Sequence, residues 1–141
     1  TQLNLEISSR AFYIYCPVKK EFKMTLKIYE YNKCSTCKKA LKYLDERNIS
    51  FETIAIREQA PSISELEFML SKTGNIKKLL NSSGQDYRAL NMKEKIKTMS
   101  EKEIFKLLTE NGNLVKRPFV LDRSSNIGIT GFKSDDWDQL F

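Results

Sequence analysis

The chain has 141 residues, which is enough for one domain with its own hydrophobic core and no need for disulfide cross-links. Its composition, 40% hydrophobic and 30% charged, is that of a globular protein, and no apolar run approaches the roughly 20 residues of a membrane-spanning helix. The net charge of +6 comes from lysines interleaved with acids, so we expect a mixed solvated surface, with no membrane and no direct nucleic acid as partner.

Histidine is absent and cysteine occurs three times. The absence of histidine excludes Ser-His and Cys-His catalysis, and it excludes metal sites built on imidazole. An odd number of cysteines, two of them spaced Cys-x-x-Cys, is typical of reactive thiols in a reducing compartment, so we expect a cytoplasmic protein. A thiolate in this chain would have to be stabilised by dipoles and cations alone.

Residues 1–23 differ in character from the rest of the chain. They carry a short aromatic patch at 11–15 that ends at Pro17 and a basic cluster, and this patch is too short for a secretory signal. Met24 then directly precedes a strand pattern. We interpret 1–23 as an extension that is non-native or reflects a mis-assigned start, with an added strand as the alternative; its Cys16 receives no role.

The segment that follows predicts a strand–helix–strand unit. Residues 25–31 alternate and are rich in β-formers, residues 35 to about 48 carry apolar side chains at helical spacing, and residues 51–56 form a second strand pattern. A unit this compact implies two parallel strands joined by a right-handed crossover.

The middle of the chain, about 62–112, predicts a helical insert. Ser62-x-x-Glu65 and Ser100-x-x-Glu103 are two capping-box patterns, and Gly74 is suited to end the first of the helices they open. We expect helices at 63–73, 76–80, 86–90, 93–98 and 101–111, with a loop at 81–84.

The C-terminal part predicts a β-hairpin and one more helix. Residues 119–122 and 127–130 are strand patterns on either side of a Ser-Ser-Asn turn, and Ser134 is expected to cap a final helix that carries Trp137. The order β-α-β, helical insert, β-β-α predicts an α/β fold with a four-stranded mixed sheet.

Cys34 and Cys37 lie where the first strand passes into the first helix. The unpaired N–H groups and the positive dipole at a helix start favour a thiolate, and Lys33 and Lys38 act in the same direction. Cys37 is one turn further on and can close a disulfide with Cys34, so we expect Cys34 to attack and Cys37 to resolve. Half a zinc site is the alternative, but no other cysteine pair or histidine could complete it, and we expect no metal.

Pro118 immediately precedes the strand predicted at 119–122. Proline cannot donate to a central ladder, so it indicates a strand start, an edge, a bulge or a cis bond. The cis form would bring Arg117 beside the cysteines, and we predict that the Arg117–Pro118 bond is cis.

Together these motifs resemble the arsenate reductase/Spx (ArsC/Spx) family. The resemblance covers residues 24–141 and rests on Asn-x-Cys-x-x-Cys, on Arg-Pro-Phe-Val-Leu-Asp at 117–122, and on a loop with Asn81, Gly84, Tyr87 and Arg88. It implies a thioredoxin-like fold with an inserted helical subdomain. It also implies that Cys34 is the nucleophile, that Arg117 binds an oxyanion, and that Pro118 is the cis-proline beside them.

The sequence departs from the family pattern at two points. Glutaredoxin-linked arsenate reductases of this family use three arginines, whereas here only Arg117 is plainly retained; Asn81 takes one arginine position and residues 129–132 contain none. Asn81 and Arg88 are therefore candidate substrate-binding residues, with Arg88 a possible substitute for the missing charge. Those reductases also use a single active-site cysteine, whereas Cys37 supplies an internal resolving thiol as in the Spx regulators.

The resemblance implies three functional hypotheses. The first is a thiol oxidoreductase without a bound cofactor, in which a small oxyanion or disulfide is reduced with electrons from glutathione, a glutaredoxin or a thioredoxin. The second is an Spx-like regulator that docks on RNA polymerase and uses the cysteine pair as a redox switch, and the third is a family member without turnover. Spx-type regulators continue with a charged tail beyond the last helix, so we expect the enzyme, acting as a monomer.

Overall fold

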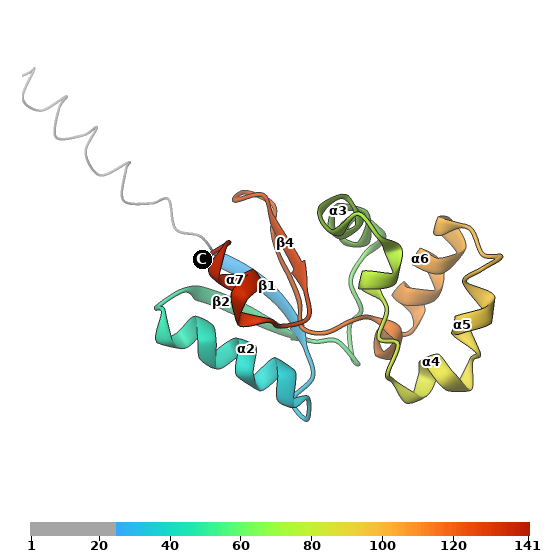
Figure 1. The fold of residues 1–141 in the computed structure, drawn as a ribbon, viewed down its shortest axis with the longest axis horizontal. Helices are drawn as coiled ribbons and strands as arrows, with labels where there is room; N and C mark the ends of the chain where they lie inside the picture. Colours follow the sequence, from blue (N-terminus) through green and yellow to red (C-terminus); the bar gives the residue numbers. More distant parts are fainter. Residues whose placement is uncertain (1–24) are drawn as a thin grey trace, which may run out of the picture.

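The computed structural model describes residues 25–141 as an α/β fold (Figure 1). The elements are β1 (Thr25–Glu30), α2 (Ser35–Glu46), β2 (Ser50–Ala55), α3 (Ile63–Thr73), η1 (Ile76–Leu79), α4 (Gln85–Ala89), α5 (Met92–Lys95), α6 (Glu101–Glu110), η2 (Gly112–Leu114), β3 (Phe119–Asp122), β4 (Ile127–Thr130) and α7 (Ser134–Asp138). The segment 1–23, with Cys16, lies outside the described residues.

The four strands form one mixed sheet in the order β2-β1-β3-β4. β1 and β2 are parallel, and Thr25 pairs with Ser50, as expected when a helix makes the crossover between them. β3 runs antiparallel to β1, and β4 runs antiparallel to β3 as the second strand of a hairpin. The predicted sheet is thus confirmed, and β1 and β3 are its central strands.

Side chains that alternate along the strands divide the core into two layers. Ile28 and Val120 face α2 and α7, where they pack near the fully buried Trp137. Tyr29 and Phe119 point to the other face and pack against the helical insert. In Figure 1 the helices α2 and α7 lie on one side of the sheet, and the helices α3 to α6 lie on the other.

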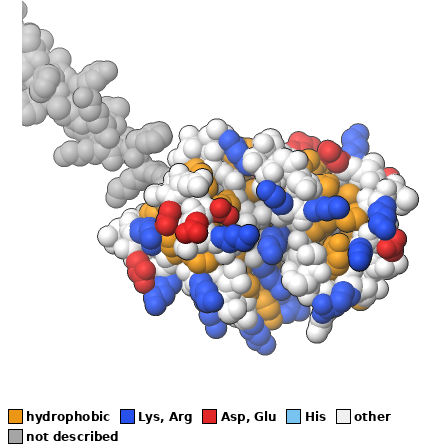
Figure 2. Space-filling model, viewed as in Figure 1, with side chains coloured by type: hydrophobic (Ala, Val, Ile, Leu, Met, Phe, Trp, Pro, Cys, Tyr) orange, Lys and Arg blue, Asp and Glu red, His pale blue; other side chains and the backbone are white. Residues whose placement is uncertain are grey.

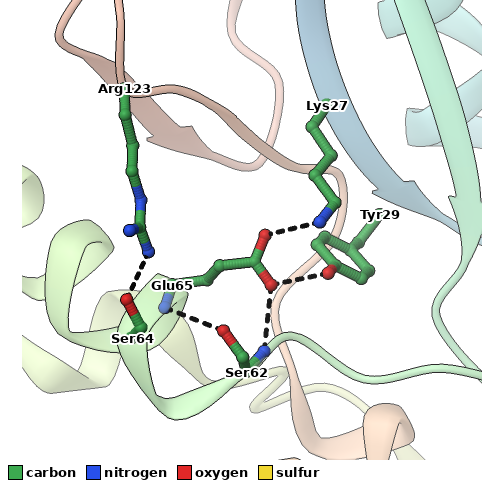
Figure 3. A network of polar contacts seen from close by, with 6 residues as sticks. All are labelled: Lys27, Tyr29, Ser62, Ser64, Glu65 and Arg123. Carbon is green, nitrogen blue, oxygen red and sulfur yellow. Dashed lines mark hydrogen bonds and ion pairs between the residues drawn. The ribbon is translucent and has the colours of Figure 1, made fainter.

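A polar network joins the insert to the sheet at the start of α3 (Figure 3). Ser62 and Glu65 form the predicted capping box, with hydrogen bonds of 3.2 and 3.0 Å. The Glu65 carboxylate also accepts a 2.6 Å hydrogen bond from the Tyr29 hydroxyl and lies 3.0 Å from the Lys27 ammonium, both on β1. One buried carboxylate therefore caps a helix of the insert and ties that helix to the central strand.

Two expected caps differ in detail from the structure. The Ser100 hydroxyl accepts the N–H of Glu103, but the Glu103 carboxylate accepts from that hydroxyl and not from the Ser100 backbone, so the reciprocal bond is missing. Ser134 is the first residue of α7 and does not cap it; Lys133 occupies the N-cap position without a side-chain hydrogen bond. The short α7 is instead anchored by Trp137, whose indole N–H donates to the Gly131 carbonyl at 3.1 Å.

No helix within residues 25–141 is both long and apolar enough to cross a lipid bilayer.

Candidate active site

Cys34 occupies the N-cap position of α2, directly after the turn that leaves β1. Its backbone is extended (φ −87°, ψ 116°), and its Sγ accepts a hydrogen bond from the N–H of Cys37 at 3.4 Å. Cys37 and Ala40 belong to the buried stripe of α2, so packing of this helix on the sheet fixes the orientation of its first turn. Both thiols are free; Cys34 is half-buried and Cys37 is buried.

The surroundings of Cys34 favour its thiolate. Partial burial acts to raise the pKa of this thiol, but hydrogen bonds from the backbone and thiol of Cys37, the charge of Arg117 and the N–H of Thr36 outweigh it. The net result is a pKa below the ordinary value for a cysteine. The stabilising groups are those that a helix N-terminus and one nearby cation can supply, as this histidine-free chain requires.

The environment of Cys37 has the opposite effect. Burial is the main cause that raises its pKa to about 12, and the hydrogen bond and negative charge of Cys34, together with Glu30, add to it, while a hydrogen bond from the Tyr31 backbone opposes it. Cys34 is therefore the first of the two thiols to lose its proton, and the buried Cys37 is the one that keeps it. This asymmetry suits an attacking thiolate at Cys34 and a protonated partner at Cys37.

Arg117 approaches Cys34 from the segment before β3. The Arg117–Pro118 peptide bond is cis, as predicted. The guanidinium carbon lies 4.9 Å from the centre of the Tyr31 ring. Its Nη1 is buried and has no hydrogen-bond partner among residues 25–141. A buried guanidinium nitrogen without a partner, close to a thiolate, is a group that can bind an anionic substrate or a developing charge.

Tyr31 contacts several parts of this arrangement. Its carbonyl accepts the N–H of Cys34 at 3.0 Å, so its backbone helps to form the turn into α2. Its hydroxyl accepts a 2.8 Å hydrogen bond from Arg57, whose guanidinium carbon also lies 4.9 Å from the ring centre. Tyr31 therefore links the cysteine turn with two arginines that come from other segments.

Cys34 opens into a cleft of about 980 Å³ between the sheet, with α7, and the helical insert. Its basic lining residues are Lys72, Lys77, Lys78, Lys116, Arg117 and Lys133, and its acidic one is Asp136. None of the six cations forms an ion pair within the described part of the chain. Figure 2 shows lysine and arginine side chains gathered across the middle of this face. The positive potential of such a cleft attracts anions.

The structure brings Cys34, Arg117 and Asn81 together at the cleft, but not Arg88. The Asn81 amide is nearly buried and its Nδ2 donates to the Asn113 carbonyl at 3.3 Å, so this group helps to hold the loop. Arg88 is exposed, four residues beyond Gly84 on α4, and does not line the cleft. Arg88 therefore lies apart from the other residues that the sequence proposed for the site.

Pro118 is buried behind the cleft wall and does not line it. Its carbonyl accepts the N–H of Gly131 at 2.9 Å, which joins the start of β3 to the end of β4. Its place in the site is therefore to shape the backbone beside Arg117.

Sequence analysis missed the lysines of the cleft. They come from α3, from η1, from the residue before Arg117 and from the residue before α7, so no local pattern unites them. The adjacent pairs Lys77-Lys78 and Lys116-Arg117 were the local signals of a basic surface. Within residues 25–141 no group of three or more metal-ligating side chains lies together.

A cysteine at the start of the first described helix, a cis-proline directly before a central strand and a four-stranded mixed sheet together give this chain a thioredoxin-like fold. The family model described as ArsC family matches residues 29–140. The chain belongs to the ArsC family.

Two curated relatives come from Bacillus subtilis (strain 168). The uncharacterised protein YusI is 44% identical over 117 residues, which is 82% of this chain and 98% of that protein. The regulatory protein MgsR is 31% identical over 98 residues, or 69% of this chain and 76% of that protein. The family thus includes a protein named as a regulator as well as one without an assigned role.

Solved structures agree with this placement. A protein related to the ArsC family from Bacteroides fragilis aligns with a TM-score of 0.77 and 37% identity, over 85% of this chain and 100% of that one. A possible arsenate reductase from Streptococcus mutans UA159 aligns with a TM-score of 0.72 and 36% identity, over 80% of this chain and 97% of that one.

Proposed function

We propose that this protein is a thiol-dependent reductase that acts on disulfides, with Cys34 as the nucleophile and Cys37 as the resolving thiol. The observation that carries the proposal is the Cys34 thiol itself. Its pKa is lowered by Cys37 and Arg117 against the effect of burial, and it opens into a cationic cleft. A stabilised, accessible thiolate beside a buried thiol is what thiol–disulfide exchange requires.

The reaction would take place in three steps. The Cys34 thiolate attacks one sulfur of the substrate disulfide; a mixed disulfide forms, and the other substrate sulfur leaves as a thiolate and takes up a proton. The Cys37 thiol then loses its proton and attacks the Cys34 sulfur, which releases the second substrate thiol and leaves a Cys34–Cys37 disulfide. Two thiols of the electron donor reduce this bond and are themselves oxidised to a disulfide.

The first step removes part of what raises the pKa of Cys37. Burial remains, but the negative charge of Cys34 and its hydrogen bond to the Cys37 thiol both disappear once Cys34 is in a mixed disulfide. The pKa of Cys37 therefore falls at the stage at which this thiol must act. The resolving thiol is thus kept inactive until a substrate is bound covalently.

We propose glutathione, a glutaredoxin or a thioredoxin as the electron donor, with no bound cofactor. The cleft of about 980 Å³ is at the upper end of the roughly 300–1,000 Å³ typical of small-molecule sites. It is large enough for a tripeptide, and its cations complement the two carboxylates of glutathione. We also propose that the protein works in the cytoplasm, where such donors keep thiols reduced.

An Spx-like regulator is the second candidate function. The similarity to MgsR, a protein named as regulatory, favours it. In that case the protein would dock on RNA polymerase, and oxidation of Cys34 and Cys37 would change its affinity rather than complete a catalytic cycle.

Turnover of a small mixed disulfide of glutathione, with glutathione as reductant, tests the proposal. We expect multiple turnovers that Cys34→Ser abolishes, whereas Cys37→Ala keeps a slower rate because glutathione can resolve the mixed disulfide directly. Cys16→Ser serves as the control and should keep the wild-type rate. No turnover, combined with redox-dependent binding to purified RNA polymerase, would show that the regulator hypothesis is right.

A further inference from the structure

A second hollow adjoins the Cys34 cleft on the helical insert and has a volume of about 570 Å³. We call it the apolar groove: Ile76, Leu80, Tyr87 and Ile96 contribute apolar surface, and Lys77, Lys93 and Lys97 are exposed around it. The isoleucines and Tyr87 also pack against the core of the insert. The groove is therefore backed by well-packed structure.

The apolar groove is continuous with the cleft, because Lys77, Leu80 and Ser82 line both. The wall between them is held in place by the backbone: the N–H of Lys116 donates to the Leu79 carbonyl at 2.8 Å. A ligand whose disulfide reaches Cys34 can thus continue over η1 into the groove.

The charges along this surface are nearly all positive. Of the residues that the structure describes, the cleft contributes six cations and one acid, Asp136, and the groove adds Lys93 and Lys97 and no acid. Among the described residues, Lys97 is the only one of these cations that forms an ion pair, with Glu94 at 3.1 Å. The surface is complementary to a ligand with several carboxylates spread over some length.

This inference rests on the proposed reductase function: we infer that the disulfide belongs to a polypeptide. Acidic residues near its cysteine lie against the lysines, and an apolar side chain occupies the groove. An oxyanion or a single glutathione would leave the groove empty. The chemistry is unchanged: the polypeptide's disulfide breaks, Cys34 bonds to one of its sulfurs, the other leaves as a thiol, and the electrons come through Cys37 from glutathione.

Three peptides of equal length test the surface, each with one cysteine in a mixed disulfide with glutathione. The first carries glutamates and leucines on both sides of the cysteine, the second has glutamines for the glutamates, and the third has alanines for the leucines. We expect kcat/KM for the first to exceed that for the second by about tenfold at low ionic strength, with the difference shrinking as salt is added. The third should also be poorer than the first.

Charge-reversed variants test which surface causes the preference for the glutamate peptide over the glutamine peptide. Lys77→Glu/Lys93→Glu changes the groove, and Lys102→Glu/Lys106→Glu makes the same change in charge on α6, where these exposed residues line neither hollow. We expect the groove variant to lose the preference for glutamate over glutamine, and the α6 variant to keep it. An equal preference in both variants, or none in the wild type, would overturn the inference.

A binding measurement distinguishes a failure of the polypeptide-substrate inference from a failure of the reductase proposal. Fluorescence anisotropy with Cys34→Ser, which cannot react, should show tighter binding of the first peptide than of the second. Selective binding without turnover in the wild type would refute the reductase but leave the surface assignment standing. Turnover of all three peptides and of oxidised glutathione at equal rates would support the reductase and refute the polypeptide substrate.

Discussion

The reactivity of Cys34 depends on groups from two separate segments. The first turn of α2 provides N–H groups and the Cys37 thiol, and the segment before β3 provides the charge of Arg117. Because burial opposes these contributions, the lowered pKa is a balance that a single substitution can change.

Arg117→Gln should raise the pKa of Cys34. A lowered pKa means that the thiolate is present below the pH at which an ordinary cysteine ionises, so loss of the Arg117 charge moves the midpoint of reactivity to higher pH. The measurement is the rate of iodoacetamide alkylation against pH, read by mass spectrometry on the peptide that contains Cys34. Lys116→Gln is the control, because Lys116 lines the cleft but is not among the main groups that shift this pKa.

Tyr31 should affect the pH midpoint of Cys34 alkylation, because its ring contacts Arg117. The ring supports the guanidinium by a cation–π contact, worth about 0.5–1 kcal/mol where it is partly exposed. We expect Tyr31→Leu to shift the alkylation midpoint of Cys34 upward, and Tyr31→Phe, which keeps the ring and loses only the bond from Arg57, to shift it little. An unshifted midpoint in Tyr31→Leu would show that Arg117 is positioned by other contacts.

At the scale of elements, α3 and β1 are joined through Glu65. Its carboxylate accepts from Tyr29 and from the Ser62 N–H and pairs with Lys27, and it is 7% exposed. We expect Glu65→Gln to lower the free energy of unfolding by about 1–3 kcal/mol at pH 7, since a buried charge-assisted network is broken. Chemical denaturation measures it, and Glu67→Gln, an exposed neighbour on the same helix, should have little effect.

The same variant should show a defined pH dependence. Burial acts to raise the pKa of Glu65, but hydrogen bonds from Tyr29, Ser62 and Lys27 outweigh it, and the pKa is below its usual value. A group whose pKa is lower in the folded state stabilises the fold above its unfolded pKa, and this contribution is lost as pH falls through its folded pKa. The difference between wild type and Glu65→Gln should therefore shrink below about pH 4. A difference that grows on acidification would contradict this account.

At the scale of the whole molecule, we expect the cleft to support the reduction of disulfides better than the reduction of arsenate. Within residues 25–141, Arg117 is the only arginine that lines it, and loss of one oriented donor to a developing oxyanion typically costs about 10²–10³ in rate. We expect kcat/KM for arsenate to be lower than for a glutathione mixed disulfide by about 10² or more. Arsenate reduction as fast as disulfide reduction, abolished by Cys34→Ser, would mean that the lysines replace the missing arginines.

Much of the fold could be predicted because its signals are local. The capping box at Ser62, the left-handed Gly74 at the end of α3 and the strand patterns lie close to their predicted bounds. The reciprocal bond predicted at Ser100 and the cap predicted at Ser134 were wrong, because a serine before a helix can bond in several ways and packing decides among them. The position of Arg88 could not be predicted, because sequence spacing does not say which wall of a cleft a short helix approaches.

By itself, the sequence determined that a cysteine pair lies at a helix start and that no histidine can act beside it. The absence of histidine and the strand–Cys-x-x-Cys–helix order are properties of neighbouring residues, and neighbouring residues control helix capping and thiolate stabilisation. Only the tertiary structure brought Arg117 onto Tyr31 and gathered lysines from four segments around Cys34. The physical reason is that a local bond depends on sequence distance, whereas an electrostatic field depends on distance in space, which the packing of the insert on the sheet decides.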